Sequence, residues 1–246
     1  MLKTVLATAI GLLAADAALA QTTLSRNTSV VAPTTVQHPQ PNGSFALTQS
    51  GSLAITAANS VSCNAGAPNF NHTDNFYYRR FNLDGNFAAT GNVTIASVDI
   101  GVEQATGAGG TQPITVNLYA IPNASTLTMA NLGAPIATAS VAVIDQIGSL
   151  LNVPIAGSLN GLTHDLVIEV ATPDGQTAGN TFFIGSNATS SINPAGAPSF
   201  IRAPGAAGCN INEPTATSTI GFADMNIVMV ANATTLPVSL QNFSVD

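Results

Sequence analysis

The sequence predicts an all-β protein, a single β-sandwich or jelly-roll-like domain of about ten to twelve short antiparallel strands. Hydrophobic residues make up 46% of the chain and charged residues only 7%, which leaves too few charges for helices with a solvated face. The chain also contains 21 Gly and 14 Pro. These residues separate short segments in which apolar and polar side chains alternate, which is the pattern of strands joined by turns.

The first twenty residues have the pattern of a targeting segment. Lys3 lies close to the start, residues 5–13 are apolar, and Ala18-Leu19-Ala20 fits a small-residue cleavage site before Gln21. The apolar run is too short to span a membrane as a helix, and no later run is longer. We therefore expect a signal peptide of bacterial style and no transmembrane segment in the mature chain.

Three parts follow from this division. Residues 1–20 are the expected signal peptide, and residues 21–50 are a Pro-, Thr- and Ser-rich lead-in with little periodicity. Residues 51–246 are the expected β-sandwich domain. Export predicts a secreted or extracellular protein, with the periplasm and the cell surface as alternatives.

The charge balance restricts the partners. Beyond residue 20 the chain has four arginines, no lysine and eleven acidic residues. A lysine-free acidic surface is poorly suited to phosphate groups. We therefore expect no nucleic-acid partner and no attachment to anionic membranes.

Two cysteines, Cys63 and Cys209, are present. In an exported protein, two cysteines most simply form one disulfide. A metal pair or a reactive thiol is the alternative, but neither cysteine stands at a metal-ligand spacing. The disulfide would enclose most of the domain.

The strands are predicted by alternation and by the turns between them. Residues 114–120 alternate most cleanly, and residues 165–171 place Leu166, Ile168 and Val170 on one face. The full set of predicted strands is 52–56, 76–83, 92–103, 114–120, 135–144, 151–155, 165–171, 181–184, 199–202, 218–222 and 225–230, with residues 236–245 a last strand or a linker.

Turns and loops separate these strands. Asp84-Gly85-Asn86 and Pro173-Asp174-Gly175 are predicted turns, and residues 107–112 a glycine-rich loop. Residues 185–214 are expected to be irregular apart from strand 199–202, so that the disulfide would tether a region with little core of its own.

Strand 76–83 carries two adjacent arginines. Its more apolar face holds Tyr77, Phe81 and Leu83, and this turns Arg79 inward. A buried arginine must be paired and hydrogen-bonded, and the candidate partners are Asp99, Glu103 and Glu169. The alternative is that both arginines are exposed at a sheet edge.

Residues 63–85 concentrate the rare residue types of this chain. We interpret the segment as the disulfide-bonded opening strand of the sandwich. If the sequence marks a binding surface, the disulfide would bring together loop 64–75 and the loop before Cys209. The candidate surface residues there are His72, Asp74, Tyr77 and Tyr78.

Known catalytic patterns are missing from the sequence. G-x-S-x-G and H-E-x-x-H do not occur, and the three histidines, His38, His72 and His164, are far apart in the chain. No spacing selects the two facing carboxylates that a glycosidase needs. We therefore assign no catalytic or cofactor-binding residue.

Calcium is the one cofactor that the sequence leaves open. Oxygen-rich loops occur at residues 69–75, 84–86 and 174–176, and hard cations bind through such oxygens. Asx turns use the same residues for hydrogen bonds to the backbone. The sequence therefore assigns no metal ligand.

Several motifs together resemble a module of exported bacterial proteins. They are FYYRRFNLDG, SVDIGVEQA, ITVNLY, LVIEVATPDGQTAGNTFFIGSN, PSFIRAPGAAGC and IGFADMNIVMVAN, spread over residues 60–232. The ending LPVSLQNFSVD resembles the segment that precedes C-terminal sorting or anchoring signals in such proteins. The resemblance implies an extracellular β-sandwich, and it carries no active-site residues.

Two functional hypotheses follow. The first is a secreted, non-catalytic binding, adhesion or surface-structural module, with a glycan or another cell-surface component as its partner. The second is an extracellular hydrolase, or a hydrolase accessory domain, directed at polysaccharide or peptide. Clustered carboxylates, or a histidine beside two acids in a pocket, would favour the second.

Overall fold

The computed structural model describes residues 22–28, 45–204 and 209–235. These residues form fifteen strands, two short α-helices and one 3₁₀ turn, and all strand pairs among them are antiparallel. The predicted all-β class is confirmed. None of the helices in the described ranges is long and apolar enough to cross a membrane.

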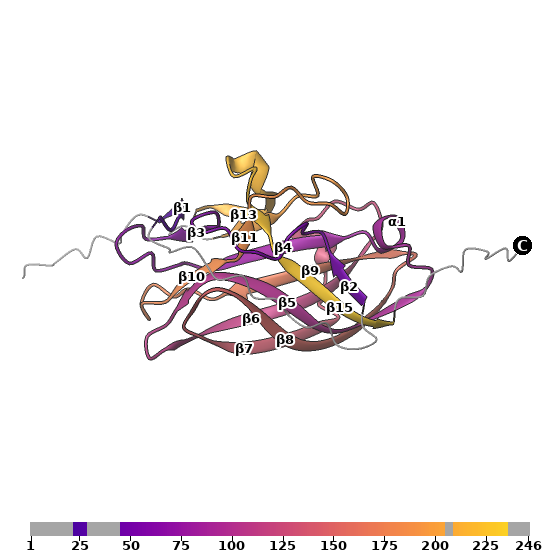
Figure 1. The fold of residues 1–246 in the computed structure, drawn as a ribbon, viewed down its shortest axis with the longest axis horizontal. Coiled ribbons are helices and arrows are strands. Elements are labelled where there is room, and N and C mark those ends of the chain that lie inside the picture. The colour runs from indigo at the N-terminus through magenta and orange to yellow at the C-terminus, as the bar shows by residue number, and fades with distance from the viewer. Residues whose placement is uncertain (1–21, 29–44, 205–208, 236–246) are drawn as a thin grey trace, which may run out of the picture.

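A six-stranded sheet forms one layer (Figure 1). Its strand order is β13 (Ile211–Ala216), β12 (Phe200–Ala203), β4 (Asn75–Phe81), β9 (His164–Thr172), β6 (Thr111–Pro122) and β7 (Ala137–Ile144).

A five-stranded sheet forms the second layer, built around the long strand β5 (Asn92–Thr106). One edge of β5 pairs along its length with β8 (Gln146–Asn160). The other edge pairs first with β15 (Met229–Thr235) and then with β10 (Thr181–Ile184), and β2 (Phe45–Thr48) lies beyond β15.

Two short pairs complete the described strands. β1 (Thr23–Arg26) pairs with β3 (Val61–Asn64), and β11 (Ser186–Asn187) pairs with β14 (Asn226–Ile227). β1 and β2 lie inside the segment 21–50, so part of the expected lead-in is built into the sheets.

The main core lies between the two layers. Tyr77, Phe81 and Ile168 of the six-stranded sheet belong to the same buried cluster as Ile100 and Phe182 of the five-stranded sheet. The chain crosses between the layers in the connections from β5 to β6 and from β7 to β8. The two connections are tied together, because the Asp145 carboxylate accepts the Gly107 N–H at 2.8 Å.

Two glycines allow close backbone contacts in the second layer, between the stretch of β5 paired with β10 and the stretch paired with β15. Gly185 donates its N–H to the Gly101 carbonyl at 2.6 Å, and Gly101 donates to Val228. A Cβ built on Gly185 would lie 2.5 Å from the carbonyl carbon of Gly101. Any larger residue at position 185 would push these backbones apart.

The outer face of the six-stranded sheet is also covered. Its buried cluster contains Tyr78, Tyr119 and Val167 of the sheet together with Leu127 and Leu132. Leu132 belongs to the short helix α2 (Met129–Leu132), which the Thr128 side chain caps at Asn131 N–H. Strands covered on both faces lose the simple inside–outside alternation that half-buried strands show.

Most strand predictions are confirmed, although the boundaries differ. Predicted strand 114–120 extends to β6, and predicted strand 151–155 is the middle of the fifteen-residue β8. Residues 236–245 lie outside the described ranges.

Four local predictions are wrong. Residues 185–214, expected to be irregular apart from strand 199–202, also contain β11 and the first part of β13. Residues 52–56 are not in a strand, and the predicted turn at 84–86 lies in α1 (Leu83–Phe87), capped by the Asn82 side chain. Predicted strand 218–222 is instead largely the 3₁₀ turn η1 (Thr217–Ile220), which ends at Gly221 in a left-handed conformation. Short segments of this kind follow local hydrogen bonding more than hydrophobic pattern.

The predicted disulfide is present. Cys63 in β3 bonds to Cys209 with a Cα–Cα distance of 5.9 Å across 146 residues of sequence. The bridge ties β3 to the chain just before β13, so it joins the β1–β3 pair to the edge of the six-stranded sheet.

Candidate functional site

The four residues of the candidate binding surface do not share an exposed surface. His72 lies in the interior, with one ring nitrogen 2.8 Å from the Thr73 carbonyl, and burial lowers its pKa. Tyr77 faces the main core and Tyr78 the covered outer face, and both are fully buried. Asp74 alone is partly exposed.

Arg79 is buried, at 1% exposure. Its partners are not the three acids that the sequence suggested. Instead, the guanidinium donates to Ser191 Oγ at 2.8 Å, Ser199 Oγ at 2.9 Å and the Ala197 carbonyl at 3.1 Å. Burial without a facing carboxylate lowers the pKa of Arg79 to about 10.

The three acids have other partners. Glu103 accepts the N–H groups of Asn59 and Ser60. Asp99 accepts from the side-chain amides of Asn152 and Asn232, and Glu169 accepts from Asn117 and Tyr119. Each acid therefore accepts hydrogen bonds from amides or hydroxyls rather than from an arginine, and Glu103 Oε1 is buried without a partner.

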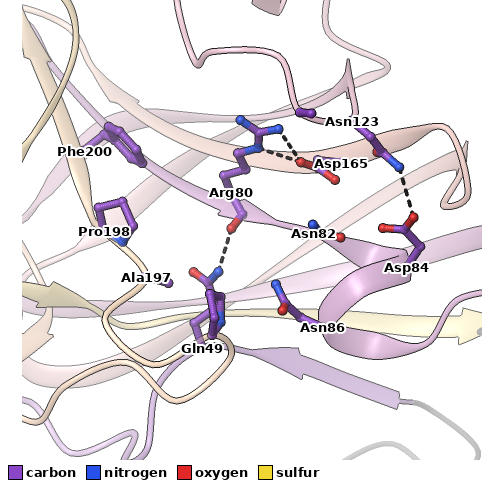
Figure 2. A pocket seen from close by; sticks show the side chains of 12 residues that line it. Gln49, Arg80, Asn82, Asp84, Asn86, Asn123, Asp165, Ala197, Pro198 and Phe200 are labelled. Carbon is purple, nitrogen blue, oxygen red and sulfur yellow. Dashed lines mark hydrogen bonds and ion pairs between the residues drawn. The ribbon is translucent and has the colours of Figure 1, made fainter.

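The hydrogen bonds of Arg79 shape a pocket of about 490 Å³, which we call the Arg80 pocket because Arg80 lines it. The segment that Arg79 holds, residues 191–199, supplies one wall through Pro194, Ala197 and Pro198. The pocket lies at one end of the six-stranded sheet, where β4 ends and β9 begins (Figure 2). Its volume falls in the usual range for small-molecule sites.

Arg80 and Asp165 form the floor of this pocket. The strand alternation that buries Arg79 turns Arg80 to the opposite face, where its guanidinium meets Asp165 at 2.5 and 2.6 Å (Figure 2). Arg80 also donates to the Ser125 carbonyl. Burial raises the pKa of Asp165, and the hydrogen bond from Arg80 opposes that rise.

The rim is built from α1 and the segment after β6. Asp84 and Asn86 line the pocket from α1, and Asn123 from the loop that follows β6. Asn123 Nδ2 donates to Asp84 Oδ2 at 3.4 Å, which links the two parts of the rim (Figure 2). Phe200, at the start of β12, adds an aromatic ring to the opposite wall.

Three buried oxygen atoms of pocket-lining side chains have no hydrogen-bond partner. They are Gln49 Oε1, Asn123 Oδ1 and Asp165 Oδ1. Gln49 and Asp165 are 2% and 1% exposed, and both are held on their other polar atom, Gln49 by the Arg80 carbonyl at 2.6 Å. Buried acceptors without a donor are costly. These three atoms are closed to water, so a ligand donor reaches them only when the side chains that line the pocket shift as it binds.

A second, smaller pocket of about 320 Å³ lies at the opposite end of the same strands. Asp74 and Asp174 line it, together with Phe76. Arg202 stacks on the Phe76 ring at 3.8 Å and donates to the Tyr78 hydroxyl. One residue of the predicted binding surface, Asp74, therefore contributes to a concave site.

The described residues contain no group of three or more His, Cys, Asp and Glu side chains that could hold a metal ion. Among the histidines considered for catalysis, His72 hydrogen-bonds to Gln112 in the interior and His164 contacts the Thr163 hydroxyl. His38 lies outside the described residues. Neither described histidine lines the Arg80 pocket.

The sequence pointed to parts of this pocket without joining them. Strand alternation places Arg80 on the face opposite Arg79, residues 84–86 are an oxygen-rich predicted turn, and predicted strand 165–171 begins at Asp165. They meet because β4 and β9 are antiparallel neighbours, and no spacing in the chain reveals that pairing.

In comparisons with known proteins, no family model, curated protein or solved structure matches the chain.

Proposed function

We propose that this protein is a secreted, non-catalytic binding module that takes one unit of a cell-surface glycan in the Arg80 pocket. The observation that carries the proposal is the combination of three unpartnered buried acceptors with a wall of Phe200 and prolines. Sugars present hydroxyl donors on their edges and apolar C–H faces. Binding sites of this kind are concave, with a few fixed polar groups among apolar ones.

Two sequence features support the extracellular setting. Residues 1–20 have the signal-peptide pattern, and the disulfide belongs to an oxidising compartment. The resemblance to exported bacterial modules agrees with this assignment, and we retain it as part of the proposal.

A screen against immobilised glycans and bacterial cell walls tests the proposal. The chain from Gln21 to Asp246 would be compared with Asp84→Asn and Asn86→Ala, which alter the pocket rim at side chains that are not buried. We expect specific binding by the wild type and a roughly three- to tenfold loss in each variant, as for one polar contact of a binding site.

Matched controls are available on the same molecule. Asp174 is exposed and accepts one nearby backbone N–H, as Asp84 does, but it lines the second pocket. Asn212 is exposed on β13. Asp174→Asn and Asn212→Ala should bind as the wild type does. If Asp174→Asn weakens binding and Asp84→Asn does not, the ligand uses the second pocket instead.

The hydrolase alternative keeps one specific observation in its favour, because two carboxylates, Asp84 and Asp165, line one pocket. Burial raises the pKa of Asp165, as a general acid requires, but the ion pair with Arg80 favours the charged carboxylate and counts against that role. Release of reducing ends from any bound glycan, abolished in Asp84→Asn, would establish hydrolysis and overturn the non-catalytic assignment.

A further inference from the structure

The basic residues that the structure describes each contact groups of the protein itself. Beyond Lys3 the chain has four, Arg26, Arg79, Arg80 and Arg202, and the structure describes each of them. Arg26 pairs with Asp224, and Arg202 stacks on Phe76. Arg79 is buried among serine hydroxyls. Of these four arginines only Arg80 lines the Arg80 pocket, and its charge is paired with Asp165, so no free arginine among the described residues lines that pocket.

The Arg80 pocket also has no unpaired basic side chain among the residues that the structure describes. Its one basic side chain binds Asp165 and the Ser125 carbonyl, so its charge is already compensated. Asp84 adds a carboxylate on the rim, which faces no arginine and is held by an N–H and an amide. The charged side chains that line the pocket therefore carry a net charge of about −1.

The unpartnered polar atoms of the pocket also favour electropositive ligand groups, because they are all acceptors. Gln49 Oε1, Asn123 Oδ1 and Asp165 Oδ1 are acceptors, and all three are buried without a donor. A ligand group that satisfies them must donate hydrogen bonds. A sugar hydroxyl does so and a protonated amine does so, whereas a carboxylate or sulfate is an acceptor only.

We propose that the Arg80 pocket selects sugars that are neutral or carry an amine, and rejects acidic sugars. This inference rests on the proposed glycan-binding function and specifies its ligand class. An acidic sugar would place its anion beside Asp84 and three unpartnered oxygens, with no free arginine or lysine among the residues that line the pocket to receive it. Excess acceptors favour the donor-rich ligands instead.

The test measures binding of the chain from Gln21 to Asp246 to three sets of oligosaccharides matched in length. The sets are neutral glucans, mannans and galactans, then chitosan oligosaccharides as amines, then oligomers of galacturonate, glucuronate and guluronate as acids. Neutral glycans that bind would be measured again after oxidation of their primary hydroxyls to carboxylates. We expect oxidation to weaken binding at least fivefold at low ionic strength, and less at high salt because the repulsion is screened.

A charge variant distinguishes selectivity at this pocket from the general acidity of the protein. Asp84→Asn removes the rim charge and should reduce the discrimination against oxidised glycans by about two- to fivefold, as for a partly exposed charge pair. Asp174→Asn removes the same charge elsewhere and should leave the discrimination unchanged. Equal thermal midpoints for both variants would establish that each is folded.

The outcomes separate the two proposals. Binding of acidic oligosaccharides as tightly as neutral ones overturns the selectivity and leaves glycan binding intact. Equal effects of Asp84→Asn and Asp174→Asn also overturn it, because the discrimination would then come from overall charge. Failure to bind any of the three sets overturns the glycan-binding function and this inference with it.

Discussion

At the scale of single residues, the adjacent pair Arg79 and Arg80 connects the core to the candidate site. Because successive strand residues point to opposite faces, Arg79 enters the interior and Arg80 enters the pocket. Arg79 fixes the wall of the pocket from behind through Ser191, Ser199 and Ala197. The sequence predicted which arginine turns inward, but the hydroxyl partners come from a segment more than a hundred residues away.

We expect Arg79→Met to destabilise the protein. The substitution removes three buried hydrogen bonds, and recovery of the desolvation cost of the guanidinium offsets part of that loss. The expected decrease in the free energy of unfolding is about 1–3 kcal/mol, measured by urea denaturation.

The matched control for this substitution is Arg26→Met. Arg26 pairs with Asp224 at the surface, with side chains 28% and 51% exposed. Surface pairs contribute below about 1 kcal/mol. Equal midpoints for Arg79→Met and the wild type would show that the buried hydrogen bonds do not stabilise the fold.

At the scale of elements, the segments that cover a sheet determine which faces of its strands are buried. Tyr78 and Val167 lie on the face that the sequence would give to solvent, yet α2 and the segment around Leu127 bury them. The same coverage leaves a pocket at each end of β4 and β9, where the covering segment stops. Alternation predicted the strands themselves well, because it depends on neighbours in the chain. It could not predict which outer faces are covered.

The disulfide is the element-scale feature with the clearest energetic consequence. Cys63 and Cys209 are separated by 146 residues, and closing so long a loop restricts the unfolded chain by about 5 kcal/mol in the entropy model. We expect the double variant Cys63→Ser, Cys209→Ser to lose about 2–5 kcal/mol of unfolding free energy. Reductant should lower the stability of the wild type and leave the double variant unchanged. Labelling of both thiols in the unreduced, denatured wild type would disprove the bridge.

At the scale of the whole molecule, the protein is acidic, and its few arginine side chains contact other groups of the protein. The net charge is −7, and the described carboxylates differ in their partners. Asp165 and Asp224 pair with arginines, whereas Glu103 is buried and accepts hydrogen bonds from the N–H groups of Asn59 and Ser60. The pH dependence of stability therefore depends on how each carboxylate is buried rather than on the net charge.

Burial raises the pKa of Glu103 from 4.5 to about 7. Between these values the folded protein binds a proton that the unfolded chain has released. The free energy of unfolding should therefore fall as the pH rises from 4.5 to about 7, and then change no further from this group. The decrease amounts to at most about 3 kcal/mol.

Urea denaturation of the wild type and Glu103→Gln across this range measures the effect. The variant should lack this decrease, so the stability difference between the two proteins should change with pH. His72, whose burial lowers its pKa, contributes equally to both proteins and cancels in the comparison. Glu213→Gln, at an exposed glutamate, should keep the wild-type slope. Parallel curves for the wild type and Glu103→Gln would refute the assignment.

The all-β class, most strand positions, the disulfide and the inward direction of Arg79 could be predicted from the sequence, because they depend on composition, on alternation along the chain and on having only two cysteines. The partners of Arg79, the burial of His72 and Tyr78, and the meeting of Arg80 with Asp165 and Asp84 follow only from the three-dimensional arrangement. Each of these depends on which strands are neighbours and which segments cover the sheet. Such contacts join residues far apart in the chain, and their energies are set by packing rather than by local pattern.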